Sequence, residues 1–307
     1  MRIVVAGSGG VGGYFGAKLA KAGEDVTFVA RGKHLEAIRA NGLQIRSAVE
    51  GDWSVKASAV ESLEGHEPAD LVLFCVKSFD TEQAAKMLWP VVGDHTGILS
   101  LQNGIDNEDK LGRVLGADHA MGGVAYIFSN IESPGVIAHH QLGRIVFGEM
   151  DGRTSDRSTA FADACRRASL AIDVTPRIRK VLWEKYVILV ALAGTTSVTR
   201  LPVNFIREVP ETYRLWELQV EELLALAAAD DAGLDADVMD KCASFLRSLA
   251  PGNYSSLYQD LVQGRHLELE ALHGHAVRLG ERLDVPTPTL SAVYAAVRPY
   301  LHGTPQA

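Results

Sequence analysis

The sequence predicts an α/β N-terminal domain with a doubly wound parallel sheet, followed by an all-α C-terminal domain. Short β-branched runs alternate with amphipathic stretches from residue 2 to about 150, and strand-like runs stop after about residue 174. A glycine-rich turn follows the first run. The chain of 307 residues exceeds the usual size of one hydrophobic core. We therefore expect two domains, 1–174 and 175–307.

The strands of the first domain are predicted from β-branched and other apolar runs. They are Ile3–Ala6, Val26–Ala30, Leu71–Val76, Ile98–Leu101 and Ile145–Phe147. Helices are expected between them at 11–22, 34–41, 80–89 and 106–115. This alternation favours a parallel sheet. Two further runs, Leu43–Arg46 and Trp53–Ala57, indicate an inserted antiparallel hairpin.

The second half shows helical periodicity in five stretches, 177–193, 205–232, 235–249, 255–282 and 287–301. Prolines lie near their expected ends, where a missing amide hydrogen does least harm. No uninterrupted apolar stretch approaches the roughly 18 to 20 residues that cross a bilayer, and no leader precedes the first strand. We expect no membrane partner.

Charge and cysteine content narrow the function further. A formal net charge of −8 is a poor match to the phosphate backbone of a nucleic acid. The three cysteines are widely separated and lack the spacing of metal or redox sites, which favours a reducing cytoplasm. No histidines recur with Cys or carboxylates at ligand spacing, so we expect no metal site and surface or capping roles for the histidines.

The glycine-rich turn lies between the first strand and the first helix. Its residues are Gly7, Ser8, Gly9, Gly10, Val11 and Gly12. In a Rossmann-type domain the first glycine permits a tight turn, the second lets a pyrophosphate approach, and the third allows close helix packing. Glycine clusters also serve simple turns, but the strand–glycine–helix order favours dinucleotide binding.

The residue after the second strand indicates which dinucleotide is bound. Arg31 occupies this place, with Lys33 nearby, where an NAD-preferring site normally has an acidic side chain. A guanidinium can form paired hydrogen bonds with the 2′-phosphate of NADPH, whereas a carboxylate would repel it. The alternative is that both residues are solvated loop charges.

Four further segments, in this order and spacing, resemble the ketopantoate reductase (2-dehydropantoate 2-reductase) family along essentially the full chain. They are Val76-Lys77-Ser78, Gln102-Asn103-Gly104, Leu182-Trp183-Glu184-Lys185, and Asn253 to Asp260 followed by Gly264 to Glu270. The resemblance implies hydride transfer from NADPH to the ketone of a 2-keto acid, with 2-dehydropantoate as the leading substrate.

The resemblance also implies roles for individual residues. Lys185 would be the catalytic acid, because an ammonium can stabilise the developing oxyanion and then donate a proton. Apolar neighbours on its helix should lower its pKa. Glu268 would orient the substrate hydroxyl. Without the resemblance, Lys185 would be a surface lysine, and Glu268 would be an ordinary helix charge within reach of Arg265.

Further binding residues follow from the same resemblance. Asn103 would contact cofactor and substrate, Lys77 the cofactor, and Asn253 and Ser256 the substrate. From the residues alone, Asn103-Gly104 is equally a turn signal, and Asn253 could be a helix N-cap. Lys77 could be an exposed lysine at a strand end.

The chain departs from the family pattern on the helix that follows the acid lysine. Leu189 and Ala193 stand where the family usually has asparagines, on one helix face, so that wall of the pocket should be less polar. The hydroxyls of residues 195–197 could compensate. A different, more apolar 2-keto acid is therefore the close alternative.

Two other interpretations stay open at this stage. One is a non-catalytic NADPH-binding sensor, which the presence of Lys185 and Glu268 disfavours. The other is a hydroxyacid or opine-type dehydrogenase, for which we find no suitably placed His-centred pair. The oligomeric state is not fixed by the sequence, and a homodimer is compatible with it.

Overall fold

The computed structural model describes residues 1–305. The chain divides into two compact units. The first comprises Met1–Gln102 and Asp106–Ile178, and the second comprises Asn103–Ile105 together with the residues from Arg179 onward. The sequence placed the boundary after residue 174 and contained no sign that the turn at 103–105 groups with the helical unit.

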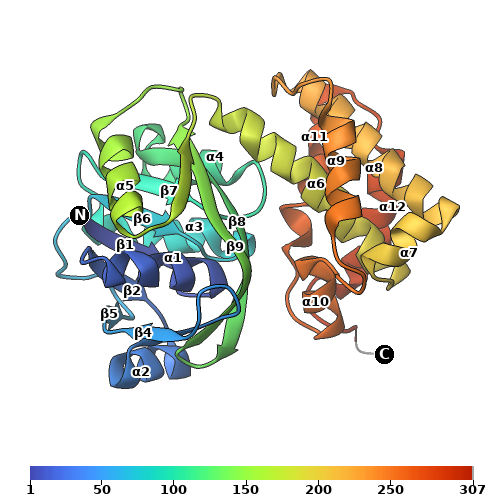
Figure 1. Ribbon diagram of the computed structural model, residues 1–307. Coiled ribbons are helices and arrows are strands. Elements are labelled where there is room, and N and C mark those ends of the chain that lie inside the picture. Colours follow the sequence, from blue (N-terminus) through green and yellow to red (C-terminus); the bar gives the residue numbers. More distant parts are fainter. Residues whose placement is uncertain (306–307) are drawn as a thin grey trace. The chain divides into compact units, whose positions relative to one another are not determined.

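One ten-stranded mixed sheet forms the centre of the first unit (Figure 1). Its strands are β1 (Arg2–Ala6), β2 (Asp25–Val29), β3 (Leu43–Ser47), β4 (Trp53–Val55), β5 (Ser58–Val60), β6 (Leu71–Phe74), β7 (Gly97–Ser100), β8 (Ala120–Ser133), β9 (Val136–Glu149) and β10 (Ala171–Val174). Their order is β4-β3-β9-β8-β7-β6-β1-β2-β5, with β10 beside β9. The parallel neighbours β7, β6, β1 and β2 confirm the predicted doubly wound core.

The antiparallel part of the sheet is larger than predicted. β3 and β4 pair antiparallel, as expected. The long hairpin of β8 and β9 was missed except for residues 145–147. Residues 130–133 of β8 and 140–142 of β9 are exposed whichever way they point, so the apolar alternation that marks a strand is absent in these stretches. The short strands β5 and β10 were also missed.

Helices cover both faces of this sheet. They are α1 (Gly10–Lys21), α2 (Gly32–Asn41), α3 (Thr81–Lys86), α4 (Asn107–Leu115) and α5 (Asp156–Arg167), with 3₁₀ turns η1 (Ser78–Asp80), η2 (Trp89–Val91) and η3 (Ala117–His119). Side chains of β1 alternate between two cores: Ile3 and Val5 join the core that includes α1 and α5, while Val4 and Ala6 join the core that includes α3 and α4. Burial on both faces explains why β1 is apolar throughout.

The second unit is helical, as predicted. Its elements are α6 (Ile178–Thr199), α7 (Val203–Glu208), α8 (Pro210–Ala229), α9 (Val238–Ser248), α10 (Ser256–Val262), η4 (Glu268–Glu270), α11 (His273–Leu283), α12 (Pro288–Val297) and η5 (Arg298–Tyr300). The single helices predicted at 205–232 and 255–282 are each wrong. Pro210 starts a new helix because it has no amide hydrogen to continue the old one. Gly264 has φ +65°, which the helix cannot accommodate.

α6 is the central helix of the second unit's core. Trp183, Tyr186 and Val190 are buried in that core. By length and composition alone α6 could cross a membrane, which the sequence analysis did not anticipate, but 67% of its most apolar window is buried. A buried core helix of a soluble protein passes the same test, and α6 also carries charged residues such as Lys180 and Lys185.

Candidate active site

The glycine-rich turn has the geometry that a dinucleotide requires. Gly7 has φ +98°, and a Cβ there would lie 2.7 Å from the backbone of Cys75 and Val76. A Cβ on Gly12 would lie 2.2 Å from the Gly7 carbonyl oxygen, so only glycine allows α1 to start this close to β1. At Gly9, apart from the glycine itself and its chain neighbours, no atom of residues 1–305 lies within 4 Å of the Cβ position. That open space at a helix N-terminus fits a pyrophosphate.

A pocket of about 370 Å³ opens beside this turn in the sheet unit. Five of the predicted cofactor residues line it, namely Gly7, Ser8, Gly9, Arg31 and Lys77. Gly10, Val11 and Gly12 do not line it and instead form the first turn of α1. Lys33 is exposed and outside the lining. Asn103 is also outside the lining and belongs to the helical unit.

Arg31 is the N-cap residue of α2, and its guanidinium is exposed beside the pocket. Its Nη2 lies 3.3 Å from the Met87 sulfur, a weak acceptor that leaves the guanidinium available for a stronger partner. The pocket lining also contains Asp80 from η1. The pocket thus offers a guanidinium available to an anionic group and a carboxylate on the same lining.

Sequence reasoning missed several residues of this pocket. The lining also includes His34, Gln83, Met87 and Ile131. Ile131 comes from the outer part of β8, an element that the sequence did not predict. His34 was within a predicted helix. Its place one helical turn after Arg31 could have indicated that it lies near the same pocket.

Lys185 lies on α6 and is half-buried. Burial lowers the pKa of its ammonium to about 8, and the nearby Glu268 carboxylate opposes that change by favouring the charged form. Glu268 is the first residue of η4 and is 8% exposed. The helical unit thus brings these two predicted catalytic residues within electrostatic reach of each other.

The alternative in which Glu268 is an ordinary charge on a helix, within reach of Arg265, does not hold. Arg265 lies 3.4 Å from Asp260 instead, outside any helix. The other carboxylate of η4, Glu270, accepts hydrogen bonds from Tyr294 (2.7 Å) and Arg278 (2.7 Å). These bonds anchor the far end of the turn that carries Glu268.

Asn253 is not the N-cap residue of α10, which was the alternative to a binding role. Ser255 caps α10, with its Oγ accepting from the Tyr258 amide at 3.1 Å. Asn253 lies two residues earlier, half-buried, and its carbonyl accepts from the Val203 amide at 2.9 Å. Ser256 is exposed at the first position of α10.

Leu189 and Ala193, which stand where the family usually has asparagines, both lie on α6. Leu189 is half-buried, and Ala193 is fully buried in the core of the unit. Two of the hydroxyls that could have compensated are already used within the protein. Thr195 donates to the Ala191 carbonyl at 2.9 Å, and Thr196 donates to the Leu192 carbonyl at 2.8 Å. Ser197 is buried, and its Oγ has no hydrogen-bond partner among residues 1–305.

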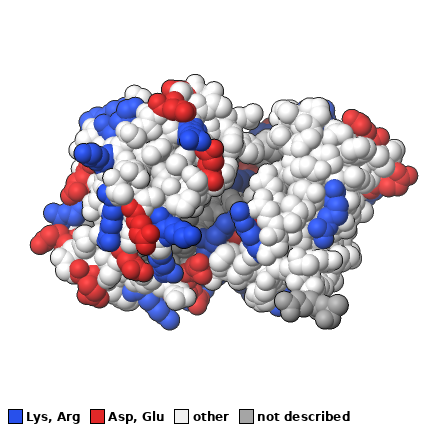
Figure 2. Space-filling view, turned by 90° about the horizontal axis from the view of Figure 1, so that it is seen from below, with Lys and Arg blue, Asp and Glu red and all other residues white. Residues whose placement is uncertain are grey.

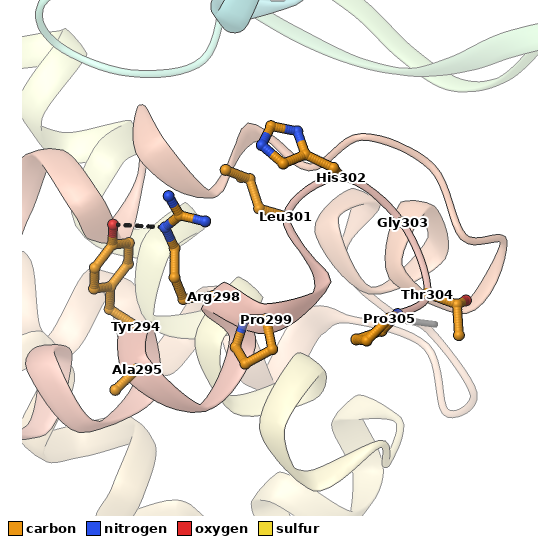
Figure 3. Close-up of a pocket in the computed structure, with 9 residues that line it drawn as sticks. All are labelled: Tyr294, Ala295, Arg298, Pro299, Leu301, His302, Gly303, Thr304 and Pro305. Carbon is orange, nitrogen blue, oxygen red and sulfur yellow. Dashed lines mark hydrogen bonds between the residues drawn. The ribbon is translucent and has the colours of Figure 1, made fainter. Parts of the chain in front are cut away.

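A second hollow, of about 610 Å³, lies near the chain's C-terminus in the helical unit (Figure 3). Figure 3 shows the Arg298 side chain beside Tyr294, whose hydroxyl accepts from Arg298 Nε at 3.2 Å. None of the predicted catalytic or binding residues lines this hollow. We therefore do not regard it as the active site.

Two histidines, His139 and His273, are buried and do not have the surface or capping role that the sequence predicted. His139 is buried between the Ser47 hydroxyl and the Leu142 carbonyl. His273 is buried in the helical unit, and burial lowers its pKa to about 3. Within residues 1–305, no three His, Cys, Asp or Glu side chains gather as metal ligands.

The visible face in Figure 2 shows Lys and Arg interspersed with Asp and Glu. Such mixing, together with the net charge of −8, gives a nucleic acid no extended basic surface on this face. The three cysteines are free. Burial raises the pKa of the Cys165 thiol to about 12, so this thiol is unreactive at neutral pH.

Comparison with known proteins identifies relatives over the whole chain. The profile described as Ketopantoate reductase PanE/ApbA matches residues 3–152, and the profile of its C-terminal domain matches residues 177–301. A 2-dehydropantoate 2-reductase of Mesorhizobium japonicum is 32% identical, over 97% of each chain. A Bacillus subtilis protein described as uncharacterized oxidoreductase YkpB is 27% identical, over 98% of this chain and 99% of its own.

Solved structures agree with this relationship. A PanE/ApbA family ketopantoate reductase from Ralstonia eutropha JMP134 superposes with a TM-score of 0.90 at 32% identity, covering 98% of each chain. D-mandelate dehydrogenase, solved with NADH and anilino(oxo)acetate, has a TM-score of 0.89 at 22% identity, which shows a shared fold.

The fold and the site define an oxidoreductase that acts on CH–OH groups, with a Rossmann-type domain and a helical domain. Both domain profiles of one family match in order, and together they cover most of the chain. The chain belongs to the ketopantoate reductase family.

Proposed function

We propose that this enzyme reduces a 2-keto acid to a 2-hydroxy acid with NADPH, and that reduction of 2-dehydropantoate to pantoate is the leading reaction. One observation carries the proposal. In the helical unit, Lys185 has a pKa of about 8 and lies within electrostatic reach of the buried Glu268. A lysine poised near neutral pH beside a carboxylate suits proton transfer to a carbonyl oxygen.

Two side chains would carry the chemistry. When bound, NADPH would supply the hydride. The Lys185 ammonium would hold the carbonyl oxygen, stabilise the negative charge that develops there, and deliver its proton to complete the alcohol. Glu268 would accept a hydrogen bond from the substrate hydroxyl and keep the ammonium charged despite its burial. Asn103, Asn253 and Ser256 would bind the substrate.

The preference for NADPH rests on Arg31. Its guanidinium lines the pocket of the sheet unit and donates there to a methionine sulfur. A phosphate would be a much stronger acceptor for it. Lys77 lines the same pocket and would add a second positive charge near the cofactor.

A second substrate class is favoured by the wall of α6. Leu189 and Ala193 offer no hydrogen bond, and the Thr195 and Thr196 hydroxyls donate to carbonyls of their own helix. A substrate hydroxyl left unpaired at this wall would lose about 1–3 kcal/mol of binding. A 2-keto acid with a more apolar side chain would lose nothing there.

A single assay separates these possibilities. NADPH absorbance is followed with purified protein and a panel of 2-keto acids, including 2-dehydropantoate and analogues whose side chains lack the hydroxyl. The highest kcat/KM with 2-dehydropantoate supports the leading reaction. A preference of about tenfold or more for the analogues, the size expected for one unpaired hydroxyl, supports the apolar class. NADPH binding without turnover of any 2-keto acid would instead indicate a non-catalytic sensor.

The role of Lys185 is tested by Lys185→Ala. We expect kcat to fall by about 10²- to 10⁴-fold while the Kd for NADPH stays nearly unchanged. Lys241→Ala is the matched control, because Lys241 is also a lysine of the helical unit but is exposed and forms an ion pair with Asp237 at 2.9 Å. A comparable loss of NADPH affinity in Lys185→Ala would mean that the lysine is structural.

The cellular compartment, the partners and the assembly of the enzyme are also proposals. We place it in the cytoplasm, because its cysteines are unpaired in the structure. We propose that it acts on a small molecule without a membrane or nucleic-acid partner, and we keep a homodimer as the candidate assembly.

A further inference from the structure

The imidazole of His34 joins two segments that are far apart in the sequence. Its Nε2 lies 2.9 Å from the Ser8 carbonyl oxygen, and the Gly135 amide donates to its Nδ1 at 3.0 Å. A backbone amide can only donate, so Nδ1 must be unprotonated. The proton is therefore on Nε2, which donates to Ser8. This arrangement fixes His34 as a neutral imidazole in one tautomer.

The segment that His34 holds is the proposed phosphate-binding turn. Gly7 and Gly9 have no side chains to fix their backbone, and Gly9 caps α1 without any side-chain hydrogen bond. Ser8, between them, is buried and tied at two points. Its hydroxyl donates to the Val29 carbonyl at 3.1 Å, and its own carbonyl accepts from His34.

The other segment is the turn of the β8–β9 hairpin. A Cβ on Gly135 would lie 2.9 Å from the Ala37 Cβ, so the hairpin turn packs directly on α2. The same hairpin meets the start of α1, since a Cβ on Gly10 would lie 2.4 Å from the Ser129 carbonyl oxygen. Ile131, also from the hairpin, lines the pocket. The hairpin thus forms a support on which the glycine turn rests.

We propose that His34 is a positioning residue for the dinucleotide. Its neutral imidazole ties the β8–β9 hairpin to the glycine turn and thereby holds the turn in the conformation that presents its amides to the pyrophosphate. This inference rests on dinucleotide binding in the proposed function and is independent of which 2-keto acid is reduced.

Three substitutions of His34 test its two hydrogen bonds one at a time and together. His34→Gln can keep a donor for Ser8, His34→Asn can keep an acceptor for Gly135, and His34→Ala keeps neither. We expect His34→Ala to raise the Kd of both NADP⁺ and NAD⁺ about tenfold, as the loss of one to two hydrogen bonds implies. The Kd values of His34→Gln and His34→Asn should be intermediate between those of wild type and His34→Ala.

The matched control is His119→Ala. His119 is another histidine of the sheet unit whose ring bonds a backbone carbonyl, that of Thr96 at 2.9 Å, but it does not line the pocket. This variant should lower Tm without changing either Kd. If His34→Ala likewise lowers Tm and leaves both Kd values within twofold of wild type, the proposal is overturned. If His34→Ala does not fold, the Gln and Asn variants decide by the same criterion.

These binding measurements omit the keto acid, so they remain valid if the proposed reduction fails.

Discussion

The alkaline limb of kcat/KM tests the proposed acid most directly. Lys185 must be protonated to act, and burial lowers its pKa from 10.5 to about 8. With a pKa of about 8, roughly nine tenths of the free enzyme carries the proton at pH 7 and roughly one tenth at pH 9. We expect kcat/KM for the keto acid to fall about tenfold over this interval and tenfold for each further unit. An unshifted lysine would hold activity constant to pH 10.

Removing the neighbouring charge should move this limb in a defined direction. Glu268 raises the pKa of Lys185, so Glu268→Gln should lower it and shift the alkaline limb to lower pH, by on the order of one unit. Glu281→Gln, at an exposed position on α11, is the control and should leave the limb in place. The assay is the initial rate of NADPH oxidation at subsaturating keto acid and constant ionic strength from pH 6 to 10. A limb that stays above pH 10, or that moves upward in Glu268→Gln, refutes the reasoning.

Three further predictions follow from other parts of the structure. Arg31→Ala should weaken NADPH selectively, and an unchanged ratio of NADPH to NADH affinities would remove Arg31 from the phosphate site. Leu189→Asn should shift the kcat/KM ratio about tenfold toward keto acids with a side-chain hydroxyl; a ratio that stays constant across the panel would show that this wall does not face the substrate. Burial alone would raise the pKa of Glu270, but hydrogen bonds from Tyr294 and Arg278 lower it overall. The resulting stability is fully present above pH 4.5 and is lost as the pH falls through the lowered value, so Glu270→Gln should flatten the acid dependence of Tm below pH 4.5 and is contradicted if the two profiles stay parallel.

Local patterns predicted the parallel core of the sheet and the position of the glycine turn. They succeeded where one short segment determines the outcome, as with β1, which is buried on both faces, and Gly7, Gly9 and Gly12, whose spacing is fixed by the turn. Local patterns failed where the structure of a segment depends on contacts with distant parts of the chain. The outer part of the β8–β9 hairpin is held by contacts with α1 and α2, and its exposed residues carry no strand signal.

The candidate site shows the same division. Lys185 and Glu268 are separated by more than eighty residues, and the family resemblance rather than any local pattern brought them together. His34 looked like an ordinary helix residue, because its partners Ser8 and Gly135 are determined by the tertiary fold. The roles of Thr195 and Thr196 also needed the structure, since a side-chain direction on a buried helix cannot be derived from spacing alone.

The grouping of Asn103–Ile105 with the helical unit has a consequence for any attempt to dissect the protein. The chain passes between its two units after Gln102, after Ile105 and after Ile178, so a single cut after Ile178 does not separate them cleanly. A fragment ending there would retain Ile105 without the apolar core against which it packs. Chimeras that exchange the helical unit between relatives must therefore carry this tripeptide along with the helices.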